Sequence, residues 1–406
     1  MTTEPTTVLH DPREHIRGLQ QLLISDTKRI GFLFGAGTSM ARKDGAPKSS
    51  VVPGVRDMTR QIIGTLKGTE FEKALESICT EVAEGHGQAL IEYILSNIVH
   101  KEEAVGKETL CGLSKDKLGQ LRKTIEDQIC NIVSVHKKAD EFMKTLIHCD
   151  LAQWIAQATR KYAVEIFTTN YDYLLELGLE YHGVPYFDGF VGSFKPFFHP
   201  SSVEDLAYLP QQTKLWKLHG SLGWDTHESL GRIVRRDTDD ATIIVFPCMS
   251  KYEASKKQPY TSFMDRLHAF LKAEDGVLIT CGYSFGDQHI NEVMLNGLER
   301  TATSHVIGLV YDDFDANSPI VSIAKSQTRL SIYGKKNAVI GGNFGNWQLR
   351  PGIVIDEPTL SLYFVSDISA KDSGKGEFIL PDYSSFVRFL SFLNYRQGTI
   401  ARGGNL

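Results

Sequence analysis

Three short polar segments, each directly after an apolar run, most constrain the fold of this 406-residue chain. They read GAGTS at 35–39, TTNYD at 168–172 and HG at 219–220, and the runs before them are GFLF, VEIF and LWKL. Short, mostly apolar runs that stop at glycine or polar residues are typical of buried strands in a parallel sheet. Because such sheets bind ligands at the carboxyl ends of their strands, the segments predict one shared site.

Further runs of this kind follow in the second half of the chain, separated in part by segments with helical spacing. The apolar runs cover residues 242–246, 276–280 and 305–310, and the helical segments cover 173–181, 262–273 and 287–298. Strands that alternate with helices predict an α/β fold with a doubly wound parallel sheet. Residues 58–161 show only helical spacing, which predicts a large helical insertion after the first strand.

The chain therefore divides into three predicted parts. A core combines residues 1–57 with 160–316, a helical insertion spans 58–159, and a C-terminal extension spans 317–406. The extension has weaker patterns, with a strand predicted at 361–365 and a closing helix at 384–393. It either packs on the core or builds an interface.

Composition narrows the class of protein. With 42% hydrophobic and 23% charged residues the chain predicts a soluble globular protein, and its net charge of −5 gives no overall basic field for nucleic acid or anionic membranes. No run approaches the roughly 18 apolar residues of a membrane span, and the N-terminus lacks an apolar signal core, so a cytoplasmic protein is expected. The six cysteines are widely spaced without a CxxC pair, which favours reduced thiols and argues against a zinc site.

The GAGTS segment has the chemistry of a nucleotide-binding turn. Gly35, Ala36 and Gly37 predict a tight turn that lets the backbone approach a pyrophosphate, whose charge amide groups at the next helix start would hold. Met40 stands where a dinucleotide-binding fingerprint has its third glycine, and the chain has no P-loop motif. Taken alone, the turn fits a strand–helix connection without a ligand equally well.

The segments at 168–172 and 219–220 supply candidate catalytic groups. Asn170 carries an amide that can hold a water molecule or a ribose hydroxyl, and Asp172 can accept a hydrogen bond from a carboxamide. His219 follows a strand end and offers imidazole, a common general base near neutral pH. The alternative is structural, because asparagine and aspartate are also frequent turn and helix-capping residues.

A fourth segment, CGYSFGD at 281–287, again follows an apolar run. Gly282 predicts close approach of the backbone to a ligand, and Ser284 offers a hydroxyl to ribose or phosphate. Asp287 is interpreted first as the N-cap of the helix that follows it.

In this order the four segments resemble the nucleotide site of the sirtuin superfamily, and the resemblance extends over roughly half of the chain. It implies a Rossmann-like core that binds NAD as a substrate, with Asn170 and His219 as the catalytic pair. The binding residues that the resemblance implies are Gly35, Ala36, Gly37 and Ser39 for phosphate and ribose, Asp172 for the nicotinamide carboxamide, and Ser284 with Gly282 on the adenosine side.

The chemistry of such a site suits these residue types. NAD carries a cationic nicotinamide leaving group on its ribose, and cleavage of that bond passes through an oxocarbenium-like state, as in glycoside hydrolysis. The enzyme must orient the ribose, exclude bulk water and deliver one nucleophile. Asn170 and His219 are adequate for this, and no metal is required.

Three departures separate the chain from protein-deacylating sirtuins. Their four-cysteine zinc ribbon is absent, TTN stands in place of TQN, and residues 45–57 share only Gly54 and Arg56 with their GxPDFR-like segment. TTNYD followed by LLEL, together with GYSFGDQHI, instead resembles the sirtuin-like NAD hydrolases of bacterial antiphage defence. By length and layout the chain is similar to the partner of a HerA-type ATPase in such systems.

The leading hypothesis is an NAD glycohydrolase that depletes cellular NAD. The alternatives are a protein deacylase or ADP-ribosyltransferase that uses the same site, and a nucleotide sensor without catalysis. Because an unrestrained NAD hydrolase would kill its host, a homo-oligomer with a gated site is expected. Candidate gates are residues 43–56 and the charged stretch 232–240, which is also interpretable as a solvated hairpin tip.

Overall fold

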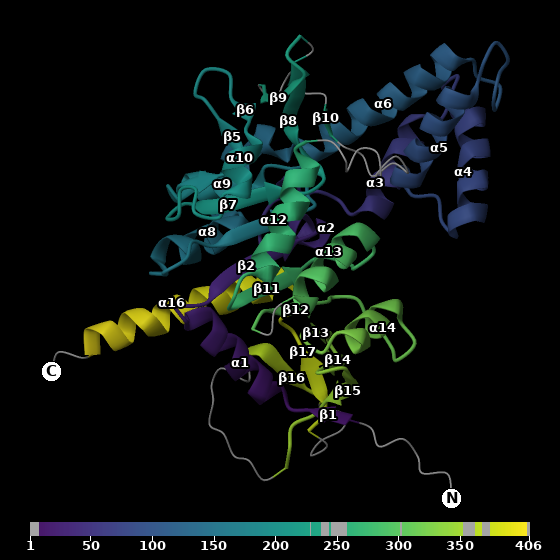
Figure 1. The fold of residues 1–406 in the computed structure, drawn as a ribbon. Coiled ribbons are helices and arrows are strands. Elements are labelled where there is room, and N and C mark those ends of the chain that lie inside the picture. Colours follow the sequence, from purple (N-terminus) through teal and green to yellow (C-terminus); the bar gives the residue numbers. More distant parts are fainter. Residues whose placement is uncertain are drawn as a thin grey trace, which may run out of the picture.

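The computed structural model describes residues 8–227, 229–236, 243–244, 258–300, 303–351, 362–367 and 374–403, with side chains at all of these except 243–244 and 394–403. Its centre is a ten-stranded sheet in the order β1-β15-β14-β13-β12-β11-β2-β3-β7-β4 (Figure 1). Seven adjacent strands of this sheet, from β13 to β4, run parallel, and six of them form its centre. They are β7 (Thr213–Lys217), β3 (Glu165–Thr168), β2 (Arg29–Phe34), β11 (Gly276–Cys281), β12 (His305–Leu309) and β13 (Leu330–Tyr333).

The order of these six strands confirms the predicted α/β class and doubly wound sheet. Numbered by their place in the chain they read 3-2-1-4-5-6, which is the order of a Rossmann sheet. The helices predicted at 173–181, 262–273 and 287–298 are confirmed as α9 (Leu174–Tyr181), α12 (Tyr260–Lys272) and α13 (Gln288–Glu299). No helix in the described ranges is long and apolar enough to cross a bilayer.

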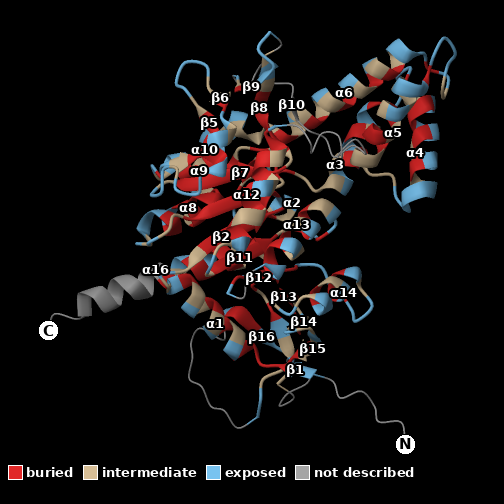
Figure 2. Ribbon diagram, in the orientation of Figure 1, coloured by how far each residue is buried: buried red, intermediate tan, exposed pale blue. Residues whose placement is uncertain are grey.

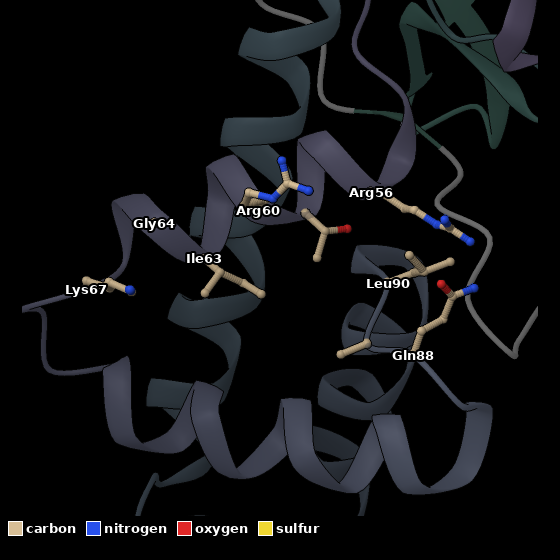
Figure 3. A pocket seen from close by; sticks show the side chains of 9 residues that line it. Arg56, Arg60, Ile63, Gly64, Lys67, Gln88 and Leu90 are labelled. Carbon is tan, nitrogen blue, oxygen red and sulfur yellow. The ribbon is translucent and has the colours of Figure 1, made fainter.

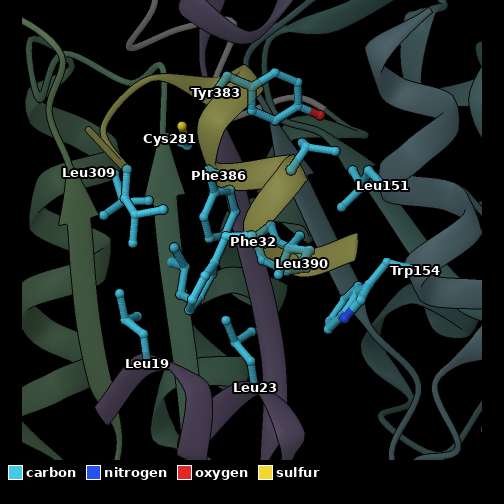
Figure 4. Packing of buried hydrophobic residues seen from close by; sticks show 14 of the residues in the cluster. Leu19, Leu23, Phe32, Leu151, Trp154, Cys281, Leu309, Tyr383, Phe386 and Leu390 are labelled. Atoms are coloured by element: carbon cyan, nitrogen blue, oxygen red, sulfur yellow. The ribbon is translucent and has the colours of Figure 1, made fainter. Parts of the chain in front are cut away.

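Helices cover both faces of the central sheet. One face carries α1 (Pro12–Ile24), α8 (Ile147–Gln157), α9 and α16 (Tyr383–Gly403), and the other carries α12, α13 and α14 (Pro319–Ser326). Alternating side chains of β2 serve the two cores, because Phe32 and Phe34 pack with the first group and Leu33 with the second. Figure 4 shows Phe386 and Leu390 of α16 packed against Phe32 in the first core. The helix predicted at 384–393 is thus part of α16.

The edges of the sheet were not predicted from the sequence. On one side β4 (Tyr186–Phe187) joins β7, and on the other side a hairpin of β14 (Asn337–Ile340) and β15 (Asn343–Trp347) follows β13. The N-terminal strand β1 (Val8–His10) then pairs with β15 in parallel. The N-terminal strand and a hairpin from the C-terminal extension therefore complete one edge of the sheet.

Four helices between β2 and β3 form a body with its own apolar core, here named the helical module. They are α3 (Val55–Thr65), α4 (Glu72–His86), α5 (Ile91–Ala104) and α6 (Lys115–Val133), and Figure 1 shows them beside the sheet. In α6 the buried residues recur at spacings of three and four, as in Leu118, Leu121 and Ile125, which places one apolar stripe inward. After the short α7 (Ala139–Phe142), α8 packs on the central sheet. The division at residues 58, 160 and 317 stays a prediction.

The structure contains a second, five-stranded antiparallel sheet. It contains β5 (Phe190–Val191), β6 (Phe197–Phe198), β8 (Gly220–His227), β9 (Arg232–Arg235) and β10 (Ile243–Ile244), and α10 (Pro200–Glu204) follows β6. The assignment of 242–246 to the parallel strands was wrong, because β10 pairs antiparallel with β8. An apolar run alone does not indicate strand direction. Of the candidate gate at 232–240, residues 232–235 form β9, and 237–240 lie outside the described residues.

A small hairpin and the burial pattern complete the fold. Strand β16 (Phe364–Ser366) pairs with β17 (Gly376–Phe378) and overlaps the strand predicted at 361–365, whose first residue lies outside the described part. Figure 2 shows the buried residues along the central sheet and on the inner sides of its helices. The carboxyl ends of the central strands therefore rest on a rigid support.

Candidate functional site

Four neighbouring strands end at the same level of the sheet. Phe34 of β2 pairs with Thr168 of β3 on one side and with Cys281 of β11 on the other, and Thr168 pairs with Lys217 of β7. The four segments singled out in the sequence follow at these ends. The structure therefore brings them together along one edge, as the sequence predicted.

Asn170 and His219 follow two adjacent strands at equivalent places. Each lies two residues beyond the register pair Thr168–Lys217, with which β3 and β7 end. From β2 the next strand of the sheet in the chain is β3, and from β11 it is β12. These two strands lie in opposite directions along the sheet, so the connections diverge between β2 and β11. Ligands of doubly wound sheets bind at this divergence, which here lies beside Asn170.

The glycines of the two central turns pack directly on each other. The amide of Gly37 donates to the carbonyl of Gly282 at 3.0 Å, and a Cβ at Gly35 would lie 2.4 Å from that carbonyl oxygen. Gly282 has φ +66°, and a Cβ there would lie 2.5 Å from the amide nitrogen of Thr38. Glycine is therefore required for contact between the turns, and phosphate binding by these residues stays a prediction. Ala36 and Ser284 are exposed on the same turns.

The Gly282→Ala substitution is expected to destabilise the protein by about 2–5 kcal/mol, since backbone overlap adds to the strain of a positive φ. Gly183→Ala is a matched control, because Gly183 has φ +62° but no atom within 4 Å of an added Cβ. We expect the control to lose only about 1–2 kcal/mol. Urea-induced unfolding measures both losses, and equal values would contradict the packing argument.

A chain of hydrogen bonds joins the first turn to the TTNYD segment. The side-chain Nδ2 of Asn170 donates to Gly35 O at 3.1 Å and to Ser39 Oγ at 2.7 Å, and it lies 3.0 Å from Thr38 Oγ1. Ser39 Oγ, on the short α2 (Ala36–Met40), donates to Asp172 Oδ2 at 2.6 Å. Since a backbone carbonyl can only accept, Gly35 fixes the nitrogen of Asn170 inward. Its Oδ1 receives no hydrogen bond from the described residues.

Asp172 is buried, and both of its carboxylate oxygens have internal donors. Oδ2 accepts from Ser39, and Oδ1 accepts from the amide of Leu174 at 3.1 Å, at the start of α9. In this conformation the carboxylate stabilises the turn. Its predicted contact with a carboxamide requires the Ser39 hydroxyl to turn away, and it stays a prediction.

His219 is held by the carboxylate of Asp287, a residue that the sequence assigned first to a helix cap. Asp287 Oδ1 accepts from the amides of His289 and Ile290, which confirms the predicted N-cap of α13. Its other oxygen, Oδ2, lies 3.0 Å from His219 Nε2, and the two side chains are 19% and 10% exposed. One sequence feature could have predicted this contact: Asp287 belongs to a segment that follows a strand, and that strand ends at the same edge of the sheet as the strand before His219.

The buried ammonium group of Lys217 stabilises the TTNYD segment through its backbone carbonyls. Lys217 Nζ lies 2.7 Å from Glu176 Oε1 and 3.0 Å from Ser221 Oγ, and it donates to the carbonyls of Tyr171 and Asp172. Burial raises the pKa of the Glu176 carboxyl, and the neighbouring ammonium opposes that rise. Lys217 was not among the predicted site residues, although a lysine inside the apolar run LWKL is a signal for a buried partner.

His148 lies on α8 in the same buried region. Its ring centre is 5.3 Å from that of Tyr383 on α16, and its Nδ1 has no hydrogen-bond partner among the described residues. Complete burial lowers the pKa of His148 to about 4, although the Asp172 carboxylate raises it. The folded protein therefore holds this imidazole neutral.

This burial predicts a loss of stability in acid. The unfolded chain binds a proton at His148 below about pH 6.5, whereas the folded chain does so only below about pH 4, so stability falls as the pH falls through this window. At pH 5 His148 alone is expected to lower the unfolding free energy by about 2 kcal/mol relative to its value above pH 7. His148→Gln should shrink the difference in unfolding free energy between pH 7.5 and pH 5, and His100→Gln, at an exposed position of α5, should not. An unchanged difference in the His148 variant would contradict the assignment.

Comparisons with known proteins identify one domain. Residues 164–330, less than half of the chain, match the family model of a SIR2-like domain. No curated protein matches. Among the solved structures that are similar, a Sir2 homologue in complex with NAD has 14% identity over 78% of this chain and 87% of that chain, with a TM-score of 0.32. A Sir2 structure with a p53 peptide and NAD+ has 12% identity over 75% and 90%, with a TM-score of 0.30. At these TM-scores the two structures add no evidence on function. The support for a sirtuin-like family comes from the match of residues 164–330 to the SIR2-like domain.

Proposed function

We propose that this chain, which contains a SIR2-like domain, hydrolyses NAD+ at the nicotinamide–ribose bond and releases nicotinamide and ADP-ribose. One observation carries the proposal. Asn170 and His219 follow adjacent strands at equivalent places, Asn170 bonds the turn at the divergence of the sheet, and a carboxylate holds the imidazole of His219. A site that only binds a nucleotide needs the glycine turns but has no use for an oriented base.

The hydrogen bonds assign roles to the two side chains in this proposal. With a proton on Nε2 facing Asp287, the lone pair of His219 is on Nδ1, which takes a proton from the attacking water. Asn170 Oδ1 accepts from that water or from a ribose hydroxyl, because its nitrogen is fixed inward. Water oxygen bonds to the anomeric carbon, and nicotinamide leaves with the electrons of the broken bond as a neutral molecule. The proposed reaction therefore requires neither a metal nor a covalent nucleophile from the protein.

We further propose that the activity serves bacterial antiphage defence in the cytoplasm, in a homo-oligomer that works with a HerA-type ATPase. The support is the resemblance of TTNYD with LLEL, and of GYSFGDQHI, to the hydrolases of such systems. Control of the site would lie in assembly and in residues 43–56, which connect the first turn to the helical module.

The test is nicotinamide release from NAD+ by the purified chain, alone and with the protein encoded beside it. We expect release without any acylated peptide, and its loss in Asn170→Ala and in His219→Ala. Release only with the neighbour would support control by assembly. Turnover that requires an acylated peptide would replace the proposal with a deacylase, and transfer of ADP-ribose to protein would replace it with a transferase.

A further inference from the structure

The helical module carries a groove that none of the predicted NAD-site residues lines. It encloses about 500 Å3 between α3 and the link from α4 to α5 (Figure 3). One wall presents Arg56, Arg60, Ile63 and Lys67, and the other presents Gln88 and Leu90. Small-molecule sites commonly have volumes of about 300–1,000 Å3, so the groove has room for a ligand of that size.

The groove is basic in a protein whose net charge is −5. Three of its lining residues are cationic and none is acidic. Arg56 and Lys67 form no ion pair with any residue in the described ranges. Arg60 pairs with Asp57 at 3.0 Å, but these side chains are 80% and 56% exposed, and such a pair contributes little and exchanges readily. Guanidinium groups one helical turn apart can bind one phosphate group together.

The remaining lining is suited to an organic ring. Ile63 on one wall, with Ala89 and Leu90 on the other, gives the groove an apolar part, and Gln88 adds an amide that can donate and accept. Figure 3 shows Arg56 and Gln88 reaching toward one end of the groove, with Leu90 between them, while Lys67 lies at the other end. A ligand that places a ring between the apolar side chains and phosphates against the arginines satisfies both parts of this lining.

We propose that this groove binds a nucleoside phosphate as an effector of the site at the central sheet. Two contacts link the places. The amide of Val52 donates to the carbonyl of Ser39 at 2.9 Å, and a Cβ at Gly54 would lie 3.1 Å from the side chain of Met40. The segment that begins α3 is therefore anchored on α2, whose Ser39 bonds Asn170. The effect on turnover rests on the proposed function, whereas binding does not.

The test is calorimetric titration of the full chain with ATP, in magnesium-free buffer at low salt and without NAD. We expect Arg56→Gln/Arg60→Gln to weaken ATP binding by about tenfold or more, because charge-assisted contacts to phosphate are lost. Adenosine should bind much more weakly than ATP. The matched control Lys115→Gln/Lys123→Gln removes the same charge from exposed positions of α6 and should change affinity by about twofold at most.

Four results would overturn the proposal. They are the absence of ATP binding at millimolar concentration, equal weakening in both double variants, displacement of ATP by NAD, and tighter binding of a single-stranded oligonucleotide or an acidic peptide through the same arginines. Urea-induced unfolding checks that both variants fold. With binding established, a change in nicotinamide release on addition of ATP is expected for the wild type only and not for the Arg56/Arg60 variant. If the chain releases no nicotinamide, the binding result still stands.

Discussion

The Asp287→Asn variant is expected to lose about two to four orders of magnitude in kcat for nicotinamide release while it keeps its fold. The oxygen of asparagine must take the place of Oδ1, because the amides of His289 and Ile290 only donate. Its NH2 group then faces His219 Nε2 in place of Oδ2. The imidazole must accept there and carry its proton on Nδ1, so it loses the lone pair that the proposed mechanism uses as the base.

Asparagine also caps helices well, so the stability of α13 should change little. Steady-state kinetics should show a loss in kcat with KM nearly unchanged, since the substrate contacts remain. Asp275→Asn is the control, because Asp275 pairs with Lys28 before β11, at the other end of that strand. Normal kcat in the Asp287 variant would remove this carboxylate from the mechanism and leave it as a helix cap.

The Lys217→Met variant is expected to lose about 3–5 kcal/mol of unfolding free energy at pH 7, because it leaves the Glu176 carboxylate buried and unpaired. The two side chains are only 4% and 11% exposed, so water cannot replace the ammonium. The loss should shrink at pH 5, since burial raises the pKa of Glu176 and its neutral form is then accessible. Urea-induced unfolding at both pH values measures this.

A double-mutant cycle isolates the pair. Adding Glu176→Gln to Lys217→Met removes the buried charge, so the double variant should be more stable than the Lys217 variant alone. A double variant that is less stable would show that the bonds of Lys217 to the carbonyls of Tyr171 and Asp172 dominate. Lys101→Met, which removes the partner of the half-exposed Glu81, should cost less than about 1 kcal/mol.

The sequence predicted the centre of the fold because its strands are buried on both faces. GFLF, VEIF and LWKL are short and mostly apolar, and each ends at a polar or glycine segment. The same rule misplaced Ile243 and Ile244, because an apolar run carries no information on strand direction. It missed β13, where Ser331 interrupts the apolar pattern, and β15, where Asn343 and Asn346 do.

For the site, the sequence predicted which segments meet but not what their side chains bond. Asn170 and His219 follow strands, so their shared edge is a matter of topology. The contact between His219 and Asp287 depends on how a turn folds back from β11, across β2 and β3, and local patterns do not contain that path. The carboxylate of Asp172 faces Ser39 for the same reason.

The placement of the helical module between β2 and β3 also sets the order in which the protein can assemble. The hydrogen bond from Thr168 to the carbonyl of Phe34 joins residues 134 positions apart, and β11 must still be added beside β2. A ribosome that adds about 5–20 residues per second exposes the first turn many seconds before its partners exist. The nascent chain can fold its helices locally, but it has no complete nucleotide site until residues beyond Asp287 have emerged. Whatever the site does, a truncated translation product that ends earlier cannot do it.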